Sequence, residues 1–323
     1  MAVVINTNVD SIKIRNILTN ATSNMSNTMQ RMSSGLQILS AKDDAAGTVI
    51  SARMKVQLNG NEIAQKNVQN ATALLQTAEG NLDVIEDNIQ RIRDLTLQAK
   101  NGTYSKDEVQ AMQDEVKERI QEINRINESA SHSSLRLFGD NDGAGAAKGL
   151  ALNGATFQVG PNDGVNNTIK ASEDLFKSIE FSALTGAKNF DLVSIYEKQA
   201  GGTPATAVSY EKPKSAAASV TAAAEAKKTG ESEFDQAIRA LDLAVDNITH
   251  RKSIIGSAGN RMESALDSLT IQHENLSSAK SIITDADIAK EASKFTQDSI
   301  LQQVSTSLLA QANQAPSVAL SLV

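Results

Sequence analysis

An unbroken heptad pattern between residues 64 and 92 restricts what this chain can fold into. Apolar residues recur there at alternating spacings of four and three, which places them on one stripe of a helix that packs against other helices. The pattern predicts a single helix from about Asp44 to Lys100, about 80 Å long at 1.5 Å per residue. The stripe consists of Ala64, Val68, Ala71, Leu75, Ala78, Leu82, Ile85, Ile89 and Ile92.

Two further segments carry stripes that can close on the first one. Asn101 and Gly102 end the long helix, and Ser105 with Glu108 predicts a capping box at the start of a second helix. Residues 234–276 place apolar side chains at most positions of a third stripe, and Lys252, Gly259 and His273 fill the remaining positions. Together the three segments predict a mainly α fold, a long antiparallel helical bundle or coiled coil built from N- and C-terminal segments.

The middle of the chain differs from both ends, because most of its Phe, Tyr, Pro and Gly residues lie there. Residues 156–159, followed by a turn rich in Gly, Pro and Asn, predict a strand, and residues 190–196 predict another. The Ala-rich residues 216–228 fit a helix or a loose linker. We therefore expect a small β-containing central region between the helical segments.

Both ends of the chain are uncharged over long stretches, residues 16–30 and 299–323. Polar residues interrupt the apolar ones throughout, which excludes a membrane span and predicts amphipathic helices with one apolar face. The large apolar side chains are too few to offset the conformational entropy of ordering the tails. We expect the tails to order only when copies pack together, through a polymerisation core of Leu18, Met25, Met32, Ile300, Val304, Leu308 and Leu320.

These features predict a layered organisation. Residues 1–43 and 286–323 are expected to form paired terminal helices, disordered in the monomer. Residues 44–180 and 231–285 are expected to form the helical bundle with its small β region. Residues 181–230 are then left as a short variable insert at the surface.

Composition argues against several classes of function. The net charge of −7, without a cluster of Lys and Arg, argues against nucleic acid as a partner. The absence of Cys excludes disulfides and thiol catalysis. His132, His250 and His273 stand alone, without a metallopeptidase pattern, and no nucleophile has a recognisable base. We expect no enzyme activity and no cofactor, and the N-terminus shows no secretory signal.

Two acidic clusters invite a metal interpretation, but helix capping explains them better. Asp43 and Asp44 lie where a linker enters the long helix, and Asp285 and Asp287 lie before the last helix. Carboxylates at these places accept backbone N–H groups and interact favourably with the helix dipole.

Several motifs resemble those of the bacterial flagellins, in the right order at both ends. The N-terminal set is INTN at 5–8, RMSSGL at 31–36, SAKDDAAG at 40–47, QTAEG at 76–80 and QRIRDL at 90–95. The C-terminal set is NRM at 260–262, DAD at 285–287 and LAQANQ at 309–314. The chain departs from the family pattern at 37–39, 281–283 and Leu308, which affects the expected contacts between subunits.

The resemblance implies a structural subunit that self-assembles into the flagellar filament. It also implies recognition by the vertebrate Toll-like receptor five through Arg91, Leu95 and Glu115; the competing interpretation of these residues is a solvated helix surface. Glycans on the central Ser and Thr residues and plain solvated loops are equally compatible with the sequence.

The resemblance further implies export through the flagellar type III apparatus, without a cleaved signal peptide. The implied partners are a chaperone on the C-terminal helix and the filament cap and junction proteins. The location is the extracellular flagellum, with a periplasmic flagellum left open. Alternatives are the hook–filament junction protein and, in another class, a soluble coiled-coil adhesin or binding module, which predicts a charged tail after residue 299.

Overall fold

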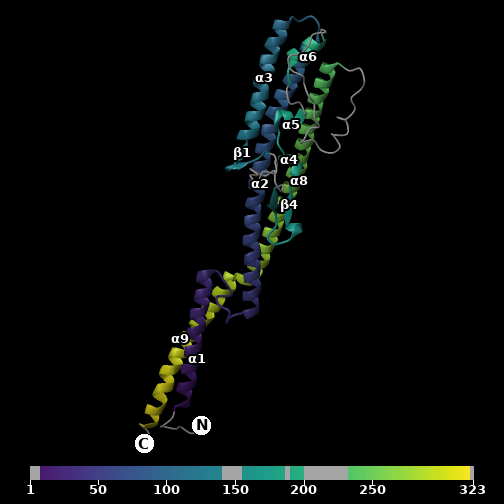
Figure 1. Ribbon diagram of the computed structural model, residues 1–323. Helices are drawn as coiled ribbons and strands as arrows, with labels where there is room; N and C mark the ends of the chain where they lie inside the picture. Colours follow the sequence, from purple (N-terminus) through teal and green to yellow (C-terminus); the bar gives the residue numbers. More distant parts are fainter. Residues whose placement is uncertain (1–7, 140–154, 186–189, 200–231, 321–323) are drawn as a thin grey trace. The chain divides into compact units, whose positions relative to one another are not determined.

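The structure, a computed structural model, describes residues 8–139, 155–185, 190–199 and 232–320. Long helices dominate these ranges (Figure 1). In chain order the elements are α1 Val9–Ser34, α2 Ala45–Lys100, α3 Lys106–Ser129, β1 Ser131–His132, β2 Leu135–Arg136, β3 Thr156–Gln158, η2 Val165–Asn167, β4 Thr168–Lys170, α4 Glu173–Phe176, α5 Phe181–Thr185, α6 Leu192–Gln199, α8 Glu233–Thr284 and α9 Ile288–Leu320.

The chain divides into two compact units. Residues 60–270 form the bundle unit, and residues 1–59 with 271–323 form the terminal unit. Helices α2 and α8 are long enough to contribute to both units.

The bundle unit is held together by the heptad stripe of α2. All nine stripe residues are buried, and they share one core cluster with Val109, Val116 and Ile123 of α3 and with apolar residues of α8. Ion pairs at the edge of the core fix α2 and α8 as antiparallel, Arg93 with Asp242 and Lys100 with Asp235, each 2.5 Å long. The predicted fold class, a long antiparallel helical bundle, is therefore confirmed.

The capping box at the start of α3 is also confirmed. The Ser105 hydroxyl accepts the Glu108 backbone N–H, and the Glu108 carboxylate accepts the Ser105 backbone N–H at 2.7 Å. The Ser105 backbone N–H, with help from the Ser105 hydroxyl, lowers the pKa of Glu108. The two side chains thus satisfy N–H groups that the first helical turn leaves unpaired.

The predicted strand at residue 156 is present as β3, which pairs antiparallel with β4. The turn between them lies tightly on α2, because a Cβ added to Gly60 would come within 2.7 Å of the Pro161 Cβ. Inside the turn, a Cβ added to Gly160 would come within 2.0 Å of the Asn167 Oδ1. Two glycines without side chains therefore let the hairpin close and pack on α2.

The strand predicted at residues 190–196 is wrong, because residues 192–199 form helix α6. Asp191 begins it, accepting the backbone N–H of Val193 and the hydroxyl of Ser194 on its carboxylate. The apolar run also fits helical spacing, with Leu192 and Ile195 both fully buried. A capped turn and packing against α3 outweigh the local strand propensity.

Residues 181–185 and 190–199, expected within the surface insert, contribute buried side chains to the bundle unit. Phe181 and Phe190 meet edge to face with ring centroids 5.4 Å apart. The Ala-rich residues 216–228 lie outside the described part of the chain.

In the terminal unit, α1 and α9 lie side by side (Figure 1). The chain leaves α1 through Gly35, whose φ of 70° suits a residue without a side chain. The following residues pair with the link between α8 and α9: Gln37 N–H donates to the Thr284 carbonyl at 2.7 Å, and Ala286 N–H donates to the Gly35 carbonyl at 2.9 Å. Within the described ranges, no helix is both long and apolar enough to span a membrane.

Candidate assembly surface

The α1–α9 pair is joined by small and polar side chains rather than by a large apolar core. Near the chain ends, Asn8 Nδ2 donates to the Ala312 carbonyl at 2.8 Å, and Ser11 Oγ donates to Asn313 Oδ1 at 2.9 Å. On α1 the buried positions are Ala21 and Thr28, and the half-buried ones include Ile14, Leu18, Met25 and Met32. Three predicted polymerisation residues thus belong to the contact within one copy.

On α9 the apolar stripe faces away from this contact. The side chains of Ile300, Val304 and Leu308 are 55%, 48% and 45% exposed, and Leu301 beside them is 42% exposed. The residues of α9 that are buried or half-buried instead are Glu291, Ala292, Lys294, Phe295, Asp298, Ser299, Gln302, Ser305, Leu309 and Ala312.

Helix α1 adds its own exposed apolar side chains to the terminal unit. Ile12, Ile17 and Met29 are 46%, 52% and 52% exposed. The two helices together therefore leave uncovered the apolar area that a single chain would be expected to bury. We name this set the outer apolar face: Ile12, Ile17 and Met29 of α1 with Ile300, Leu301, Val304 and Leu308 of α9. The side chain of Leu320, also predicted for the polymerisation core, lies outside the described residues.

One carboxylate is fully buried near the contact between α1 and α9. Glu291 is 4% exposed and lies 2.8 Å from Lys294 and 4.0 Å from Arg31, which also approaches Asp43 at 3.7 Å. Sequence reasoning missed Glu291, because it reads as an ordinary solvated residue in the first turn of a helix. The charged group is kept at one end of the pair, away from the uncharged residues 299–323.

The four predicted capping carboxylates divide into two roles. Asp44 Oδ1 accepts the Gly47 N–H at 2.9 Å, and Asp287 Oδ1 accepts the Lys290 N–H at 3.1 Å, so both lie at helix starts. Asp43 accepts the N–H groups of Leu39 and Ser40 in the linker, and the Ser40 N–H lowers its pKa. Asp285 accepts the hydroxyls of Ser281 and Thr284 at the end of α8.

A metal site is not assembled from these groups within the described ranges. No set of three or more His, Asp or Glu side chains comes together there in a way that could hold an ion. The polar linker contacts instead account for the acidic residues in the motifs around positions 43 and 285.

Two of the three residues expected at the receptor-recognition site lie at the surface of the bundle unit. Arg91 donates Nε to Glu115 Oε1 at 2.8 Å and Nη2 to Glu115 Oε2 at 3.1 Å, a bidentate pair, and Arg119 joins it at 3.1 Å. Leu95 does not share their exposed face. It is 2% exposed and belongs to the core, because the heptad packing of α2 turns it inward.

The chain matches two family descriptions that together cover most of its length. Residues 5–142 match the bacterial flagellin N-terminal helical region, and residues 238–323 match the bacterial flagellin C-terminal helical region. The chain belongs to the bacterial flagellin family. A flagellin of Bacillus subtilis is 34% identical over 99% of both chains, and a flagellin of Serratia marcescens is 34% identical over 100% of both.

A solved structure shares the fold of this flagellin at low sequence identity. A putative flagellar hook-associated protein from Vibrio parahaemolyticus matches with a TM-score of 0.51 and 14% identity, over 75% of this chain and 99% of that one. The fold alone does not separate filament from hook-associated proteins, but the full-length relatives named flagellin favour the filament subunit.

The Arg91–Glu115 pair makes the stability of the flagellin subunit depend on pH. Hydrogen bonds from Arg91 lower the pKa of Glu115 below its usual value. The pair therefore stabilises the fold above the unfolded-state pKa of about 4.3, and this contribution is lost as the pH falls through the folded-state value. In urea titrations, Glu115→Gln should lower the unfolding midpoint at pH 7 and should match the parent near pH 3. A gap that stays constant down to pH 3 would contradict this origin.

Proposed function

We propose that the outer apolar face is where neighbouring copies cover one another in the filament. This flagellin is a structural subunit of the bacterial flagellar filament and forms a homopolymer. The observation that carries the proposal is the exposure of Ile300, Val304 and Leu308, near half of each side chain, on a helix that already has a partner in its own chain. A second copy would bury this area and gain the corresponding hydrophobic free energy.

The absence of charge supports the same assignment. Placing an ion in a low-dielectric interface costs several kcal/mol unless it is well paired. Residues 299–323 and 16–30 carry no charge, so their helices can be surrounded by other helices at no such cost. The charged tail that an adhesin or solvated binding module would carry is missing from this flagellin.

The layers of the filament follow from this proposal. Residues 1–43 with 286–323 would form an inner tube, and residues 44–180 with 231–285 the surrounding layer, which residues 181–185 and 190–199 join through their buried side chains. The remainder of the insert up to residue 230 would face the outer surface. The tails would be disordered in the free subunit and would order on assembly, because the α1–α9 contact buries few large apolar side chains.

Growth on filament seeds tests this function. Purified subunits added to sheared filaments should extend them into long uniform tubes, while a chain that ends at residue 285 should not extend them. A short cap on each seed would identify a junction protein, and tubes grown from the shortened chain would overturn the role of α9.

We also propose that Arg91 and Glu115 form part of a surface for Toll-like receptor five. The pair is partly exposed, with 43% and 35% of the side chains accessible, and it is held in place by Arg119. Leu95, being buried, would support the helix behind this surface instead of touching the receptor. Arg91→Ala should weaken receptor signalling by cells while leaving the helical circular dichroism intact; unchanged signalling would remove the assignment.

For the route to the filament, we propose export through the flagellar type III apparatus to the extracellular filament or, in some cells, a periplasmic one. The outer apolar face of α9 would need cover in the cytoplasm, which fits a chaperone on the C-terminal helix. Cap and junction proteins would bind the same termini at the ends of the filament.

A further inference from the structure

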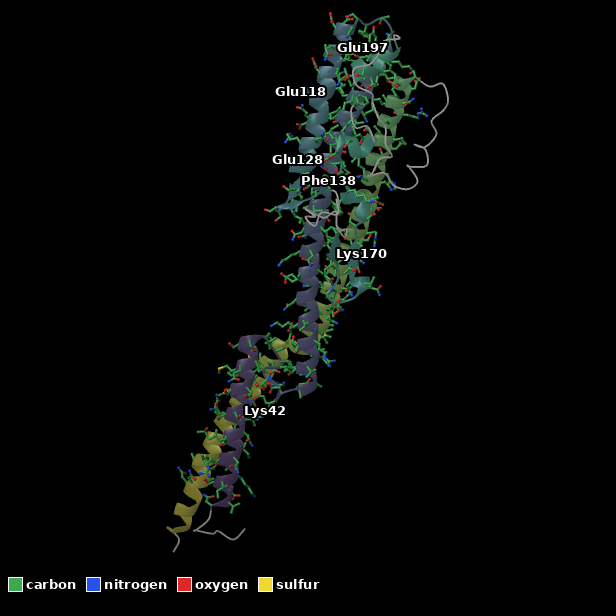
Figure 2. The ribbon with its side chains drawn as sticks, viewed as in Figure 1. Lys42, Glu118, Glu128, Phe138, Lys170 and Glu197 are labelled. Atoms are coloured by element: carbon green, nitrogen blue, oxygen red, sulfur yellow. The ribbon has the colours of Figure 1, made fainter. Side chains whose placement is uncertain are left out.

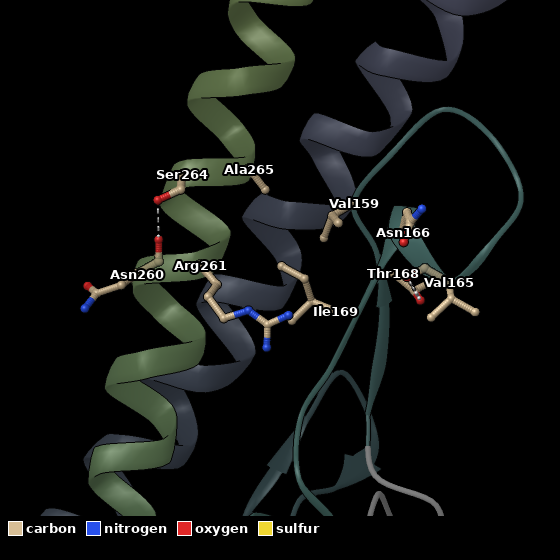
Figure 3. A pocket seen from close by; sticks show the side chains of 9 residues that line it. All are labelled: Val159, Val165, Asn166, Thr168, Ile169, Asn260, Arg261, Ser264 and Ala265. Atoms are coloured by element: carbon tan, nitrogen blue, oxygen red, sulfur yellow. Dashed lines mark hydrogen bonds between the residues drawn. The ribbon is translucent and has the colours of Figure 1, made fainter.

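A charged pair lies where the end of α1 meets the start of α9 in the terminal unit. Glu291 of α9 is buried, and Arg31 of α1 is half-buried beside it. The pocket of the bundle unit, between the β3–β4 hairpin and α8, is a different case, because its charged lining residue Arg261 is exposed to solvent (Figure 3). Removing charges from water costs free energy that only a well-formed pair recovers. The burial of Glu291 therefore needs a compensating role.

The pair contributes little to stability in the single chain. Arg31 Nη1 lies 4.0 Å from Glu291 Oε1, beyond hydrogen-bond distance. Arg31 Nε and Glu291 Oε2 are both buried, and neither has a hydrogen-bond partner among the described residues. The Arg91–Glu115 pair of the bundle unit, in contrast, forms two hydrogen bonds, at 2.8 Å and 3.1 Å. Burial of a pair as open as Arg31–Glu291 is better explained by specificity than by stability.

The rest of the α1–α9 contact does little to fix the register of the two helices. Its fully buried neutral side chains are small, Ala21 and Thr28 on α1 and Ser305 on α9. In coiled coils, register is set by large side chains that fill specific holes or by a polar residue at a buried position. Within the described ranges, no large apolar side chain of this contact is fully buried. A slip of one helical turn would therefore disturb the neutral part of the contact little.

Two anchors at opposite ends of the helix pair define the observed register. Near the chain ends, Ser11 Oγ donates to Asn313 Oδ1 at 2.9 Å, an exposed hydrogen bond that water can replace. At the other end Arg31 lies next to Glu291, so α1 and α9 are antiparallel. A slip would exchange the first anchor for water at little cost. It would separate the Glu291 carboxylate from the Arg31 guanidinium inside the contact, which is costly.

The groups on either side of Glu291 make slipped registers unfavourable. A slip of one turn in one direction brings Lys294 to Arg31, and two like charges repel each other. Lys294 is paired within α9, 2.8 Å from Glu291, so this ion pair moves with the helix. The opposite slip brings the start of α9, where the Asp287 carboxylate already accepts the Lys290 N–H at 3.1 Å. Of these three registers, only the observed one offers Arg31 a carboxylate outside the helix cap.

Arg31 gives α9 a fixed reference point. The guanidinium lies 3.7 Å from Asp43, in the linker where Lys42 is labelled in Figure 2. Asp43 in turn accepts the N–H groups of Leu39 and Ser40. The position of the guanidinium is thus tied to the linker as well as to α1.

We propose that Arg31 and Glu291 select the register in which α9 packs on α1 when the tails order during assembly. The inference rests on the proposed filament function and names the residues that position its assembly surface. A slip of one turn would move Ile300, Val304 and Leu308 about 5.4 Å along α1 and break up the outer apolar face. The charged pair gives up stability of the contact in return for a single arrangement of that face.

Cysteine pairs report the register, because the chain contains no Cys of its own. Ser11→Cys with Asn313→Cys fits the observed register, and Arg15→Cys with Asn313→Cys fits a slip of one turn. A disulfide needs Cα atoms within about 7 Å, so each pair links in its own register. In oxidised filaments the first pair should link at least about tenfold more than the second. Filaments grown from mixed isotope-labelled and unlabelled subunits allow mass spectrometry to count only the links within one chain.

Glu291→Gln removes the charge and keeps the size of the side chain. In this background the two Cys pairs should link to within about threefold of each other, and seeded growth should slow about tenfold, because fewer subunits arrive in the productive register. Glu274→Gln, the same change at an exposed site on α8, should alter neither measurement. Arg31→Lys keeps the cation and should preserve most of the preference, whereas Arg31→Gln should lose it.

An unchanged preference in the Glu291→Gln and Arg31→Gln backgrounds would overturn the inference, and so would an equal loss from Glu274→Gln. If neither glutamine variant extended seeds, growth of Arg31→Lys near the parent rate would support the pair, and its failure to grow would contradict it. Failure of the unaltered chain to extend seeds would instead refute the filament function itself.

Discussion

Substituting aspartate for Val304 is expected to reduce filament growth on seeds at least a hundredfold, in line with a cost of about 3 kcal/mol or more for an unpaired charge in a dry interface. Val304 lies in the middle of the outer apolar face and is 48% exposed in the single chain. The variant subunit should keep its bundle unit and remain soluble, because the new carboxylate is hydrated until assembly.

A matched control separates the interface from the general effect of an added charge. Val84 on α2 is 47% exposed, almost the same as Val304, and lies in the bundle unit. Val84→Asp should therefore reduce growth far less than Val304→Asp. Growth rates can be compared by light scattering and by filament length in micrographs. If both variants grew as the parent does, Val304 would not be covered in the filament and the assembly surface proposed for α9 would be wrong.

The sequence was sufficient to predict the bundle because its periodicity is carried by apolar residues. The α2 stripe is apolar at every position, so counting apolar side chains identifies the buried face directly. The capping box at Ser105 was predictable for a similar reason, since local hydrogen bonding alone decides it. In both cases the driving force lies in residues close together in the chain.

The inward face of α9 was not predictable from the same signal. Its buried and half-buried positions include Glu291, Gln302 and Ser305 at a period of 3.5, but their polarity hides them from any apolar pattern. The stronger apolar stripe of Ile300, Val304 and Leu308 points outward, where a single chain has nothing to cover it. The apolar periodicity of α9 thus indicated the face that we expect to meet other copies. The face of α9 that packs on α1 could be identified only from the structure.

The candidate receptor-recognition residues were also predictable only in part. Arg91 and Glu115 were named together from family resemblance, and they form a bidentate pair. Leu95 was placed on the same face because residues one turn apart share a side of a helix. The rule gives the side only to within a wide angle, and Leu95 falls on the covered side, 2% exposed, within the core. Spacing along the sequence alone could not distinguish a side of α2 that other helices cover from a side that is exposed to solvent.

In α8 the buried position is one residue away from the position that the sequence predicts, Arg251 instead of Lys252. The heptad pattern put Lys252 in the stripe, whereas the structure buries Arg251 to 1% exposure and places Lys252 between Asp83 and Glu86 at 2.7 Å and 2.9 Å. These two carboxylates raise the pKa of Lys252, the hydrogen bond to Asp83 being the largest cause. Arg251 is buried in place of Lys252 because the central residues after α4 provide carbonyl groups for its guanidinium.

Arg251 ties this central segment to the bundle. Its Nη1 donates to the Lys177 carbonyl at 2.8 Å and its Nη2 to the Ser178 carbonyl at 3.4 Å. On the other side, Asn127 Oδ1 accepts the Ile179 N–H at 3.0 Å, so the segment is held from α3 and α8 together. Burial lowers the pKa of Arg251 to about 10, so the guanidinium stays protonated near pH 7.

Arg251→Ala is therefore expected to lower the free energy of unfolding of the subunit by about 3 kcal/mol, from opposing contributions. Hydrogen bonds from a charged donor contribute about 1.5–3 kcal/mol each, and the empty volume left by the side chain adds a further loss. Removing the buried charge returns roughly 3 kcal/mol, the cost implied by a pKa lowered by a few units. The losses exceed this gain, because two carbonyls and a cavity remain behind.

Two further variants separate these contributions in urea unfolding of the unassembled subunit. Arg251→Met keeps most of the volume and removes the charge, so its loss should be smaller than that of alanine by the cavity contribution. Lys252→Ala removes a partly exposed ion pair, for which at most about 1 kcal/mol is expected. If alanine at positions 251 and 252 cost the same, the buried guanidinium would not hold the segment. If Arg251→Met were more stable than the parent, desolvation of the charge would outweigh both hydrogen bonds, and the packing of residues 177–179 would have to depend on Asn127.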